Sequence, residues 1–314
     1  MLKIGLIGVG GISGAHIPVW EAMENAELVA MCDIRTECME PYPDKHLYTD
    51  FDEMLENEKL DILDICLPTY LHADYAIKAM EKGIHVICEK PISLKEEDVE
   101  RVYSTAKRMN VKFMVAQVLR FWPEYELLKE LYDTKKYGKL LSGYMSRLGA
   151  CPKWSWDNWM QDPARSGLVP YDLHVHDLDF MIYAFGTPLH AENHRSKRPE
   201  QDYISATYSY EDFFVTTEAA WYAAPLPFGA GFRFQFEDAL ITYVDGKCMI
   251  YCGDDAIIDL STEATGDTGS INLPKSNAYA EEIRYFTDCV LTDKFPDKVK
   301  PKELETVIRI LNNL

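Results

Sequence analysis

The stretch GLIGVGGISGAH, residues 5–16, decides the fold of the N-terminal part of this chain. A short apolar run typical of a strand leads into a glycine-rich turn, and the turn opens a helical stretch. Gly8, Gly10 and Ser13 occupy the G-x-G-x-x-G/A spacing, with Ser13 as a mild departure at the third position. The first glycine permits a tight turn, and the second lets backbone N–H groups and the helix dipole approach a pyrophosphate. This pattern predicts a dinucleotide-binding turn formed by Gly8, Gly10, Gly11 and Ile12.

An acid in the second strand-like run supports the same prediction. Asp33 closes that run, at about the 20-residue distance expected for a carboxylate that binds the adenosine ribose. A carboxylate accepts hydrogen bonds from both ribose hydroxyls but repels a 2′-phosphate, so the sequence favours NAD over NADP. Arg35 leaves NADP as the second candidate, because an arginine there could bind the phosphate; alternatively it is a solvated loop charge.

The rest of the first 118 residues alternates strand and helix patterns. The apolar runs KIGLIG, ELVAMCD, DILDICL, HVICEK and KFMVAQ are separated by helical stretches such as HADYAIKAMEKG and LKEEDVERVYSTAKRM. This alternation predicts a Rossmann-type, doubly wound parallel sheet over residues 1–120. From about residue 139 successive strand-like runs predict an open, mostly antiparallel sheet. We therefore expect an α/β chain with a C-terminal α+β domain over 121–314, which closes with helices near 277–292 and 302–312.

Composition narrows the classes of partner. The chain has 32 Lys and Arg against 51 Asp and Glu, a net charge of −19. Such a charge repels nucleic acid and anionic membrane surfaces. No long apolar run and no signal-peptide pattern is present, so we expect a cytoplasmic protein. The eight cysteines are scattered as expected for a reducing compartment, and CMIYC, residues 248–252, reads as a strand and not as a metal site.

A longer segment resembles a known family. ICLPTYLHADYAIKAMEKGIHVICEKPIS, residues 65–93, is similar to the P-N-x-x-H…G-x-H-V-x-x-E-K-P segment of the glucose-fructose oxidoreductase and inositol dehydrogenase family, called Gfo/Idh/MocA. The resemblance continues through RFWPEY and YGKLLSG to a D-x-x-x-H element at residues 172–176 and weakens over the later strands. It implies a dinucleotide-binding domain followed by an open, mostly antiparallel sheet domain.

The resemblance also implies roles for individual residues. It places Lys90 at the nicotinamide and the substrate hydroxyl, in a turn with Glu89 and Pro91 whose Lys90–Pro91 bond is expected to be cis. Physical chemistry agrees, because a lysine at the carboxyl end of a parallel strand can stabilise a developing oxyanion. The further cofactor-binding candidates are Pro68, Thr69, which stands where asparagine is commoner, His72, Glu89 and Gln117.

The stretch YDLHVHDLDF, residues 171–180, allows two geometries. In a strand, His174 and His176 would point the same way and could form a metal pair, as in a hydrolase. In a helix, Asp172, His176 and Asp179 share one face, while His174 and Asp177 face elsewhere, toward polar surroundings. Helix is favoured by the apolar spacing and the stop signals, which are Val175, Leu178, Ile182 and Phe185, then Gly186 and Pro188.

We therefore expect an NAD-dependent dehydrogenase that acts on a secondary hydroxyl of a sugar, polyol or sugar acid, without a metal. His176 would be the general base, Asp172 its orienter or a substrate ligand, and Lys90 the group that steadies the oxyanion. Substrate-lining candidates are Arg147 and Trp159, with Tyr144 and Tyr222 as weaker ones. Two alternatives remain at this point: a non-catalytic NAD-binding sensor, and a metal-dependent hydrolase that uses His174 and His176.

Assembly is the last expectation from the sequence. The run TYSYEDFFVTTEAAWY, residues 207–222, gives one sheet face many aromatic side chains that a single chain does not obviously cover. Large exposed apolar faces usually mark interfaces. We expect a homodimer or homotetramer formed through this C-terminal sheet.

Overall fold

The computed structural model describes residues 1–253, 256–261 and 277–314, which divide into two compact units. The first unit contains residues 1–118 and 277–305, and the second contains residues 119–253, 256–261 and 306–314. The chain leaves the first unit at Val118, close to the boundary expected at residue 120. It differs from the expected single division because residues 277–305 pack with the N-terminal part and not with the second sheet.

The first unit is built on a six-stranded sheet whose neighbouring strands are all parallel. Its order, β3-β2-β1-β4-β5-β6, reverses direction at β1, as in a doubly wound fold. The strands β4 and β6 are buried on both faces, which explains why their sequences are almost entirely apolar. The strands are β1 Leu2–Ile7, β2 Ala26–Cys32, β3 His46–Tyr48, β4 Ile62–Ile65, β5 His85–Glu89 and β6 Phe113–Ala116.

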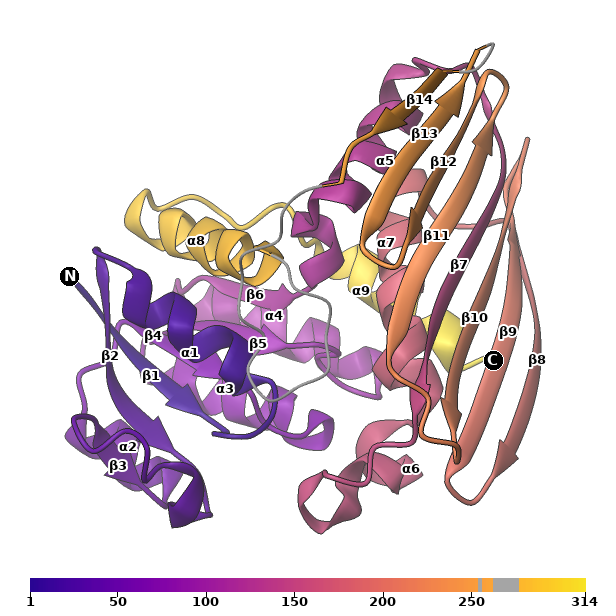
Figure 1. Ribbon diagram of the computed structural model, residues 1–314. Helices are drawn as coiled ribbons and strands as arrows, with labels where there is room; N and C mark the ends of the chain where they lie inside the picture. Colours follow the sequence, from indigo (N-terminus) through magenta and orange to yellow (C-terminus); the bar gives the residue numbers. More distant parts are fainter. Residues whose placement is uncertain (254–255, 262–276) are drawn as a thin grey trace. The chain divides into compact units, whose positions relative to one another are not determined.

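Helices cover this sheet. Right-handed crossovers on either side of β1 place the connecting helices on opposite faces. α3 (His72–Glu81) packs beside α4 (Glu96–Met109), and α1 (Ser13–Ala22) packs beside α8 (Ala278–Leu291), as Figure 1 shows. α2 (Phe51–Asn57) begins after Asp50, whose side chain accepts a hydrogen bond from the Glu53 N–H and so caps the helix. The predicted Rossmann architecture is confirmed.

The second unit contains an eight-stranded sheet of order β14-β13-β12-β11-β7-β10-β9-β8. Among the described strands, β7 and β10 form a parallel pair and the other neighbours are antiparallel, so the predicted open, mostly antiparallel sheet is confirmed. CMIYC lies in β13, as predicted. The strands are β7 Leu140–Ala150, β8 His190–Arg198, β9 Gln201–Ser209, β10 Phe214–Tyr222, β11 Gly229–Phe236, β12 Ala239–Val244, β13 Lys247–Cys252 and β14 Ala256–Asp259.

One face of this second sheet forms a core with helices. α5 (Pro123–Thr134) and α7 (Val175–Phe185) pack together on that face (Figure 1). Tyr125 of α5 makes edge contacts with Phe180 of α7 and Phe232 of β11, at ring-centroid distances of 4.9 and 5.0 Å. Such aromatic contacts fix the helices on the sheet. The remaining α-helices of the described residues are the four-residue α6 (Pro163–Ser166) and the longer α9 (Pro301–Leu311).

Candidate active site

The carboxyl edge of the first sheet carries most of the predicted cofactor-binding residues. Gly8 follows β1, Asp33 follows β2, Pro68 lies just beyond β4, Glu89 ends β5 and Gln117 follows β6. Because these strands are parallel, their carboxyl ends lie along one edge of the sheet. Ligands of doubly wound folds bind outside this edge, so the fold brings the predicted residues to the expected place.

Glycine is strongly favoured at position 8 of this turn. Its φ is +90°, in the left-handed region, and a Cβ added there would lie 2.6 Å from the Cys66 carbonyl oxygen. Its N–H donates to the Cys32 carbonyl oxygen at 2.9 Å. The turn is therefore drawn tightly against the ends of the neighbouring strands, as the first glycine of the motif requires.

Gly10 and Ser13 leave the outer side of the same turn open. A Cβ added to Gly10 would meet no described atom nearer than the Arg35 guanidinium, 3.8 Å away. Ser13 is the first residue of α1, and its hydroxyl donates to the Gly10 carbonyl oxygen at 2.7 Å. The Ser13 side chain thus closes the turn. Gly11 and Ile12, both half-buried, complete the path to the helix amino end.

Asp33 is held in place from two sides. The Val9 N–H donates to Oδ2 at 2.9 Å, and the Arg35 guanidinium donates through Nε to Oδ1 and through Nη2 to Oδ2, each at 3.1 Å. The hydrogen bond to Asp33 raises the pKa of Arg35. Arg35 is thus paired with Asp33, and its role toward the cofactor stays a prediction.

His72 links two turns of the carboxyl edge. Its Nδ1 lies 2.7 Å from the Pro91 carbonyl oxygen and its Nε2 lies 2.6 Å from the Leu67 carbonyl oxygen. The ring is almost completely buried, and burial lowers its pKa, so the neutral ring donates to one of the two carbonyls. His72 therefore supports the cofactor turn beside Pro68 and Thr69 from within. Both ring nitrogens therefore face carbonyl oxygens of the protein itself.

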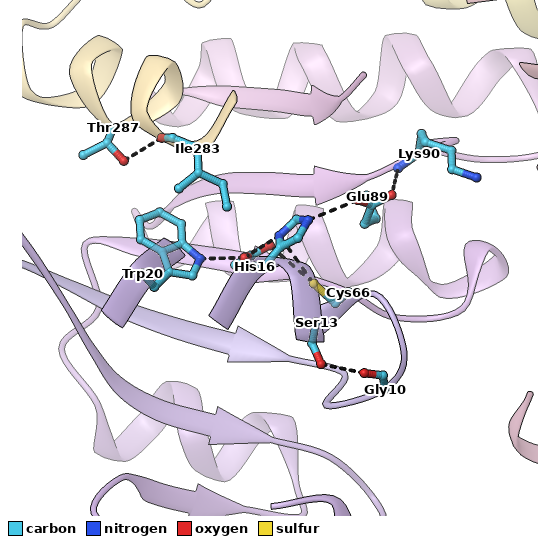
Figure 2. Close-up of polar contacts among 10 residues, drawn as sticks. Gly10, Ser13, His16, Trp20, Cys66, Glu89, Lys90, Ile283 and Thr287 are labelled. Carbon is cyan, nitrogen blue, oxygen red and sulfur yellow. Dashed lines mark hydrogen bonds and ion pairs between the residues drawn. The ribbon is translucent and has the colours of Figure 1, made fainter. Parts of the chain in front are cut away.

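The Glu89–Lys90–Pro91 turn ends β5. Its Lys90–Pro91 peptide bond is cis, as the family resemblance implied. The Lys90 N–H donates to Glu89 Oε2 at 3.0 Å, so the side chain of Glu89 folds back onto the turn. Lys90 itself is half-buried, and Figure 2 shows its side chain directed away from that of Glu89.

His16 belongs to this site, although the sequence reasoning missed it. His16 of α1 is fully buried between two carboxylates: Nδ1 lies 2.9 Å from Asp64 Oδ2 and Nε2 lies 3.2 Å from Glu89 Oε1 (Figure 2). The Trp20 indole N–H donates to the same Asp64 oxygen at 2.7 Å. The available signal was the i, i+4 spacing of His16 and Trp20, which puts both on the buried face of α1.

In the second unit, the predicted helix over YDLHVHDLDF is confirmed with one difference. Residues Pro170–His174 form a π-helical turn, and α7 follows from Val175. Asp172 and His176 are half-buried, whereas the residues between them are buried, so both belong to the partly exposed face. π-Turns are frequent at functional sites. Asp179, predicted for the same face, is instead buried, with the Arg120 guanidinium at 2.6 and 2.8 Å.

His174 and Asp177 do face away from His176, but into the protein interior. Both are fully buried. His174 Nε2 lies 2.6 Å from the Tyr208 hydroxyl, and burial, helped by the nearby Arg147 charge, lowers the pKa of His174 to about 3. Asp177 Oδ1 accepts a hydrogen bond from Arg147 Nη2 at 2.8 Å. Instead of the expected polar surroundings, each of these two side chains contacts one polar partner in the protein interior.

Arg147 requires a correction. It was expected to line the substrate site, but it lies in the interior of the second unit, 6% exposed, and its guanidinium binds Asp177. Outward residues of β7 alternate with inward ones, and Arg147 is on the inward set. The buried Asp177 carboxylate explains why an arginine is required there. We leave Arg147 out of the proposed substrate site.

The aromatic candidates have different environments. Trp159 is half-buried and packs against the apolar cluster that includes Val169, Leu173 and Trp221. The Tyr144 hydroxyl donates to Glu218 Oε2 at 2.5 Å on the outward face of the sheet. Tyr222, at the end of β10, is half-buried. The structure thus assigns Tyr144 to the sheet face.

The metal alternative finds no support at the two histidines. Within residues 1–253, 256–261 and 277–314, the group of three metal-type ligands that comes together is His16, Asp64 and Cys66, in the first unit. His174 is occupied by Tyr208 and lies on a different side of the helix from His176. The H-x-H pair therefore does not form a zinc-type site.

Comparison with known proteins agrees with this geometry. Residues 2–117 match the Gfo/Idh/MocA model described as an oxidoreductase family with an NAD-binding Rossmann fold, and residues 125–272 match a Gfo/Idh/MocA C-terminal domain. Glucose-6-phosphate 3-dehydrogenase of Bacillus subtilis is 29% identical over 63% of this chain and 57% of its own length. Myo-inositol 2-dehydrogenase of Thermotoga maritima is 28% identical over 59% of this chain and 55% of its own length.

The matched region thus spans little more than half the length of these curated relatives. Among solved structures, levoglucosan dehydrogenase in complex with NADH and levoglucosan has a TM-score of 0.83 at 18% identity, over 99% of this chain and 95% of that one, and so shares the fold. No helix in the described part of the chain is long and apolar enough to cross a bilayer. Because the two domain models together span most of its length, this chain belongs to the Gfo/Idh/MocA family of oxidoreductases, with an NAD-binding Rossmann domain at its N-terminus.

Proposed function

We propose that this protein is an NAD-dependent dehydrogenase that oxidises a secondary hydroxyl of a sugar, polyol or sugar acid, or reduces the matching ketone. The observation that carries the proposal is the placement of Lys90. It directly follows β5, on the carboxyl edge that also bears the Gly8 turn and Asp33. The relatives named as sugar and inositol dehydrogenases support the substrate class.

The first unit fits NAD. Gly8 makes the turn tight, Gly10 leaves its outer side open, and α1 offers its amino end to a pyrophosphate. Asp33 presents a carboxylate already oriented by the Val9 N–H. Bound NAD supplies the acceptor for the hydride that leaves the substrate carbon. The preference for NAD over NADP follows from Asp33, since a 2′-phosphate would have to displace Arg35 from it.

The chain's own residues supply the proton chemistry. We assign His176 as the general base that takes the hydroxyl proton, with Asp172 as its orienter or as a ligand of a neighbouring hydroxyl. Both are half-buried on the start of one helix. The Lys90 ammonium stabilises negative charge on the substrate oxygen as the proton leaves. Trp159 remains the aromatic candidate for contact with a sugar ring.

The test is a panel of polyols, aldoses and uronic acids incubated with NAD or NADP, followed by nicotinamide absorbance. Turnover of at least one member with NAD, absent in Lys90→Ala and retained in the exposed-site control Lys82→Ala, supports the proposal. Tight NAD binding with no turnover across the panel would instead identify a sensor. Activity that depends on an added divalent metal would contradict the assigned roles.

We also propose that the protein works in the cytoplasm as a homodimer or homotetramer assembled through the outward face of the second sheet. Tyr144, Tyr203 and Tyr222 are half-buried on this face, and Phe214 is 48% exposed. A patch of this kind favours self-association. Light scattering at micromolar concentration should give at least twice the chain mass of 36.1 kDa, and a monomer would contradict this assembly.

A further inference from the structure

We propose that His16 is a positioning residue for Lys90 and acts through the side chain of Glu89. The inference rests on the proposed function, in which Lys90 steadies the substrate oxygen. It concerns a part of the molecule that neither the glycine turn nor the general base explains: a fully buried histidine between two acidic side chains, one of which, Glu89, lies between His16 and Lys90 (Figure 2).

Asp64 is the acceptor on one side of the His16 ring. Its Oδ2 accepts from the Trp20 indole N–H at 2.7 Å and lies 2.9 Å from His16 Nδ1. The Cys66 thiol donates to its Oδ1 at 3.6 Å. Several donors therefore converge on this fully buried side chain and hold it in place.

Glu89 completes the arrangement on the other side of the ring. Its Oε1 lies 3.2 Å from His16 Nε2, and its Oε2 accepts the Lys90 N–H at 3.0 Å. Because both ring nitrogens face carboxylate oxygens, the ring donates at both and is an imidazolium. Burial acts against that charge, but the contributions of Asp64 and Cys66 together outweigh burial and raise the pKa of His16 well above 6.5.

These contacts join three elements of the first unit. His16 lies on α1, Asp64 on β4 and Glu89 at the end of β5. The cation fixes one oxygen of Glu89, and the other oxygen then fixes the backbone of Lys90. Without the cation, the buried Glu89 carboxylate would have lost its charged partner. The free-energy cost of burying such an unpaired charge is large enough to move Glu89 from its position. The Lys90 turn would then lose the contact that orients it.

A metal ion explains the same residues less well. His16, Asp64 and Cys66 bring ligand-type atoms within 4.8 Å of one another. A metal-binding cysteine is a thiolate, whereas burial raises the pKa of Cys66 to about 12 and keeps it a thiol. The hydrogen bonds among these three residues already satisfy the atoms that would bind the ion.

The experiment is a double-mutant cycle with a matched control. His16→Leu, Glu89→Gln and the double variant are compared with Trp20→Phe, which removes another buried donor to Asp64 but leaves Glu89 untouched. The readouts are kcat, KM, NAD affinity, and amide hydrogen exchange at Lys90. We expect His16→Leu to lower kcat by about 100-fold, since a misplacement of about 1 Å can cost that much, with NAD affinity within a few-fold.

Because His16 acts through Glu89, the double variant should lose no more kcat than the worse single variant. Lys90 amide exchange should be faster in His16→Leu than in Trp20→Phe, whose kcat should stay within a few-fold of wild type. Losses that multiply in the double variant, an equal loss of kcat in Trp20→Phe, or stoichiometric zinc that disappears with His16 would overturn the proposal.

If His16→Leu does not fold, the deciding comparison is the kcat of Glu89→Gln with that of Trp20→Phe. The amide introduced by Glu89→Gln can still hydrogen-bond the ring, whereas the negative charge is gone. If the wild type turns over no substrate, the proposed dehydrogenase function fails, but amide exchange at Lys90 still tests whether His16 fixes the turn.

Discussion

Arg35 donates two hydrogen bonds to Asp33 through its guanidinium, from Nε to Oδ1 and from Nη2 to Oδ2, each at 3.1 Å. The carboxylate expected to bind the ribose and the cation that could bind a 2′-phosphate are therefore partners of each other. A ribose hydroxyl can join this pair as a donor to the carboxylate. A phosphate must first separate the two side chains, and its charge then lies beside Asp33.

Cofactor choice is the first prediction. NAD should bind more tightly than NADP to the wild type. Asp33→Ser should release Arg35 and improve the NADP-to-NAD affinity ratio by about tenfold or more, because a repulsive carboxylate is replaced and a cation is freed. Fluorescence titration with the reduced cofactors measures the ratio. Tighter NADP binding by the wild type would show that Arg35 dominates.

Two glycines of one turn should respond differently to the same change. Gly8→Ala should destabilise the protein, because its backbone is in the left-handed region and the new Cβ would lie 2.6 Å from the Cys66 carbonyl oxygen. Gly10→Ala should keep the thermal midpoint, since the nearest atom is 3.8 Å away, but should weaken NAD binding. Calorimetry and NAD titration of both variants separate the effects. Equal thermal midpoints for the two variants would contradict the geometry.

Substitutions of His176 and His174 should distinguish a catalytic histidine from a structural one. His176→Ala should cut kcat by about 10² to 10⁴ while NAD affinity stays nearly unchanged, as expected for removal of a general base. His174→Ala should keep kcat within a few-fold of wild type, because that ring faces Tyr208 in the interior. Steady-state kinetics on a substrate found in the panel provide the comparison. If both variants were equally inactive and added zinc restored them, the metal hypothesis would be supported instead.

The buried ring of His174 should make stability depend on pH. Its pKa is lowered from 6.5 to about 3 in the folded protein, so between those values the unfolded chain binds the extra proton. Stability should therefore fall as pH drops from about 6.5 toward 3, by up to about 1.4 kcal/mol per pH unit from this group. His174→Asn should flatten that part of the curve. Urea unfolding of both proteins across this range gives the difference, and parallel curves would refute the assignment.

The pair Arg147–Asp177 should matter for folding and not for substrate affinity. Arg147→Met removes the partner of a fully buried carboxylate, which typically costs about 3–5 kcal/mol. The exposed pair Lys153–Glu200 is the control, and Lys153→Met should leave the unfolding midpoint unchanged. KM should be the same in all folded variants. A raised KM in Arg147→Met at unchanged stability would restore Arg147 to the substrate site.

Local patterns account for the parts that the sequence predicted well. The glycine spacing, the strand runs and the helical apolar spacing of residues 175–185 all concern neighbours along the chain. They identified the Rossmann domain, the mostly antiparallel sheet and the helix that bears His176. The π-turn at Pro170–His174 was not predicted, because no residue pattern distinguishes it from the first turn of an α-helix.

Long-range partners explain what the sequence did not predict. His16 meets Asp64 and Glu89 from 48 and 73 residues away, and Arg120 meets Asp179 from 59 residues away. Arg147 was predicted to line the substrate site, because its partner Asp177 lies 30 residues further along the chain and is not evident from the local sequence. Periodicity likewise predicted α8 as a helix, but it carries no information about which sheet the helix packs on.

The packing of α8 beside α1 determines when the first unit can finish folding during synthesis. A ribosome releases residues 1–118 first, yet the helix that packs beside α1 emerges only after the whole second sheet has been made. Vectorial folding therefore cannot finish the nucleotide-binding half before the other half is available. A truncation between residues 261 and 277 would retain both sheets but leave one flank of α1, the helix that carries His16, without its covering helix.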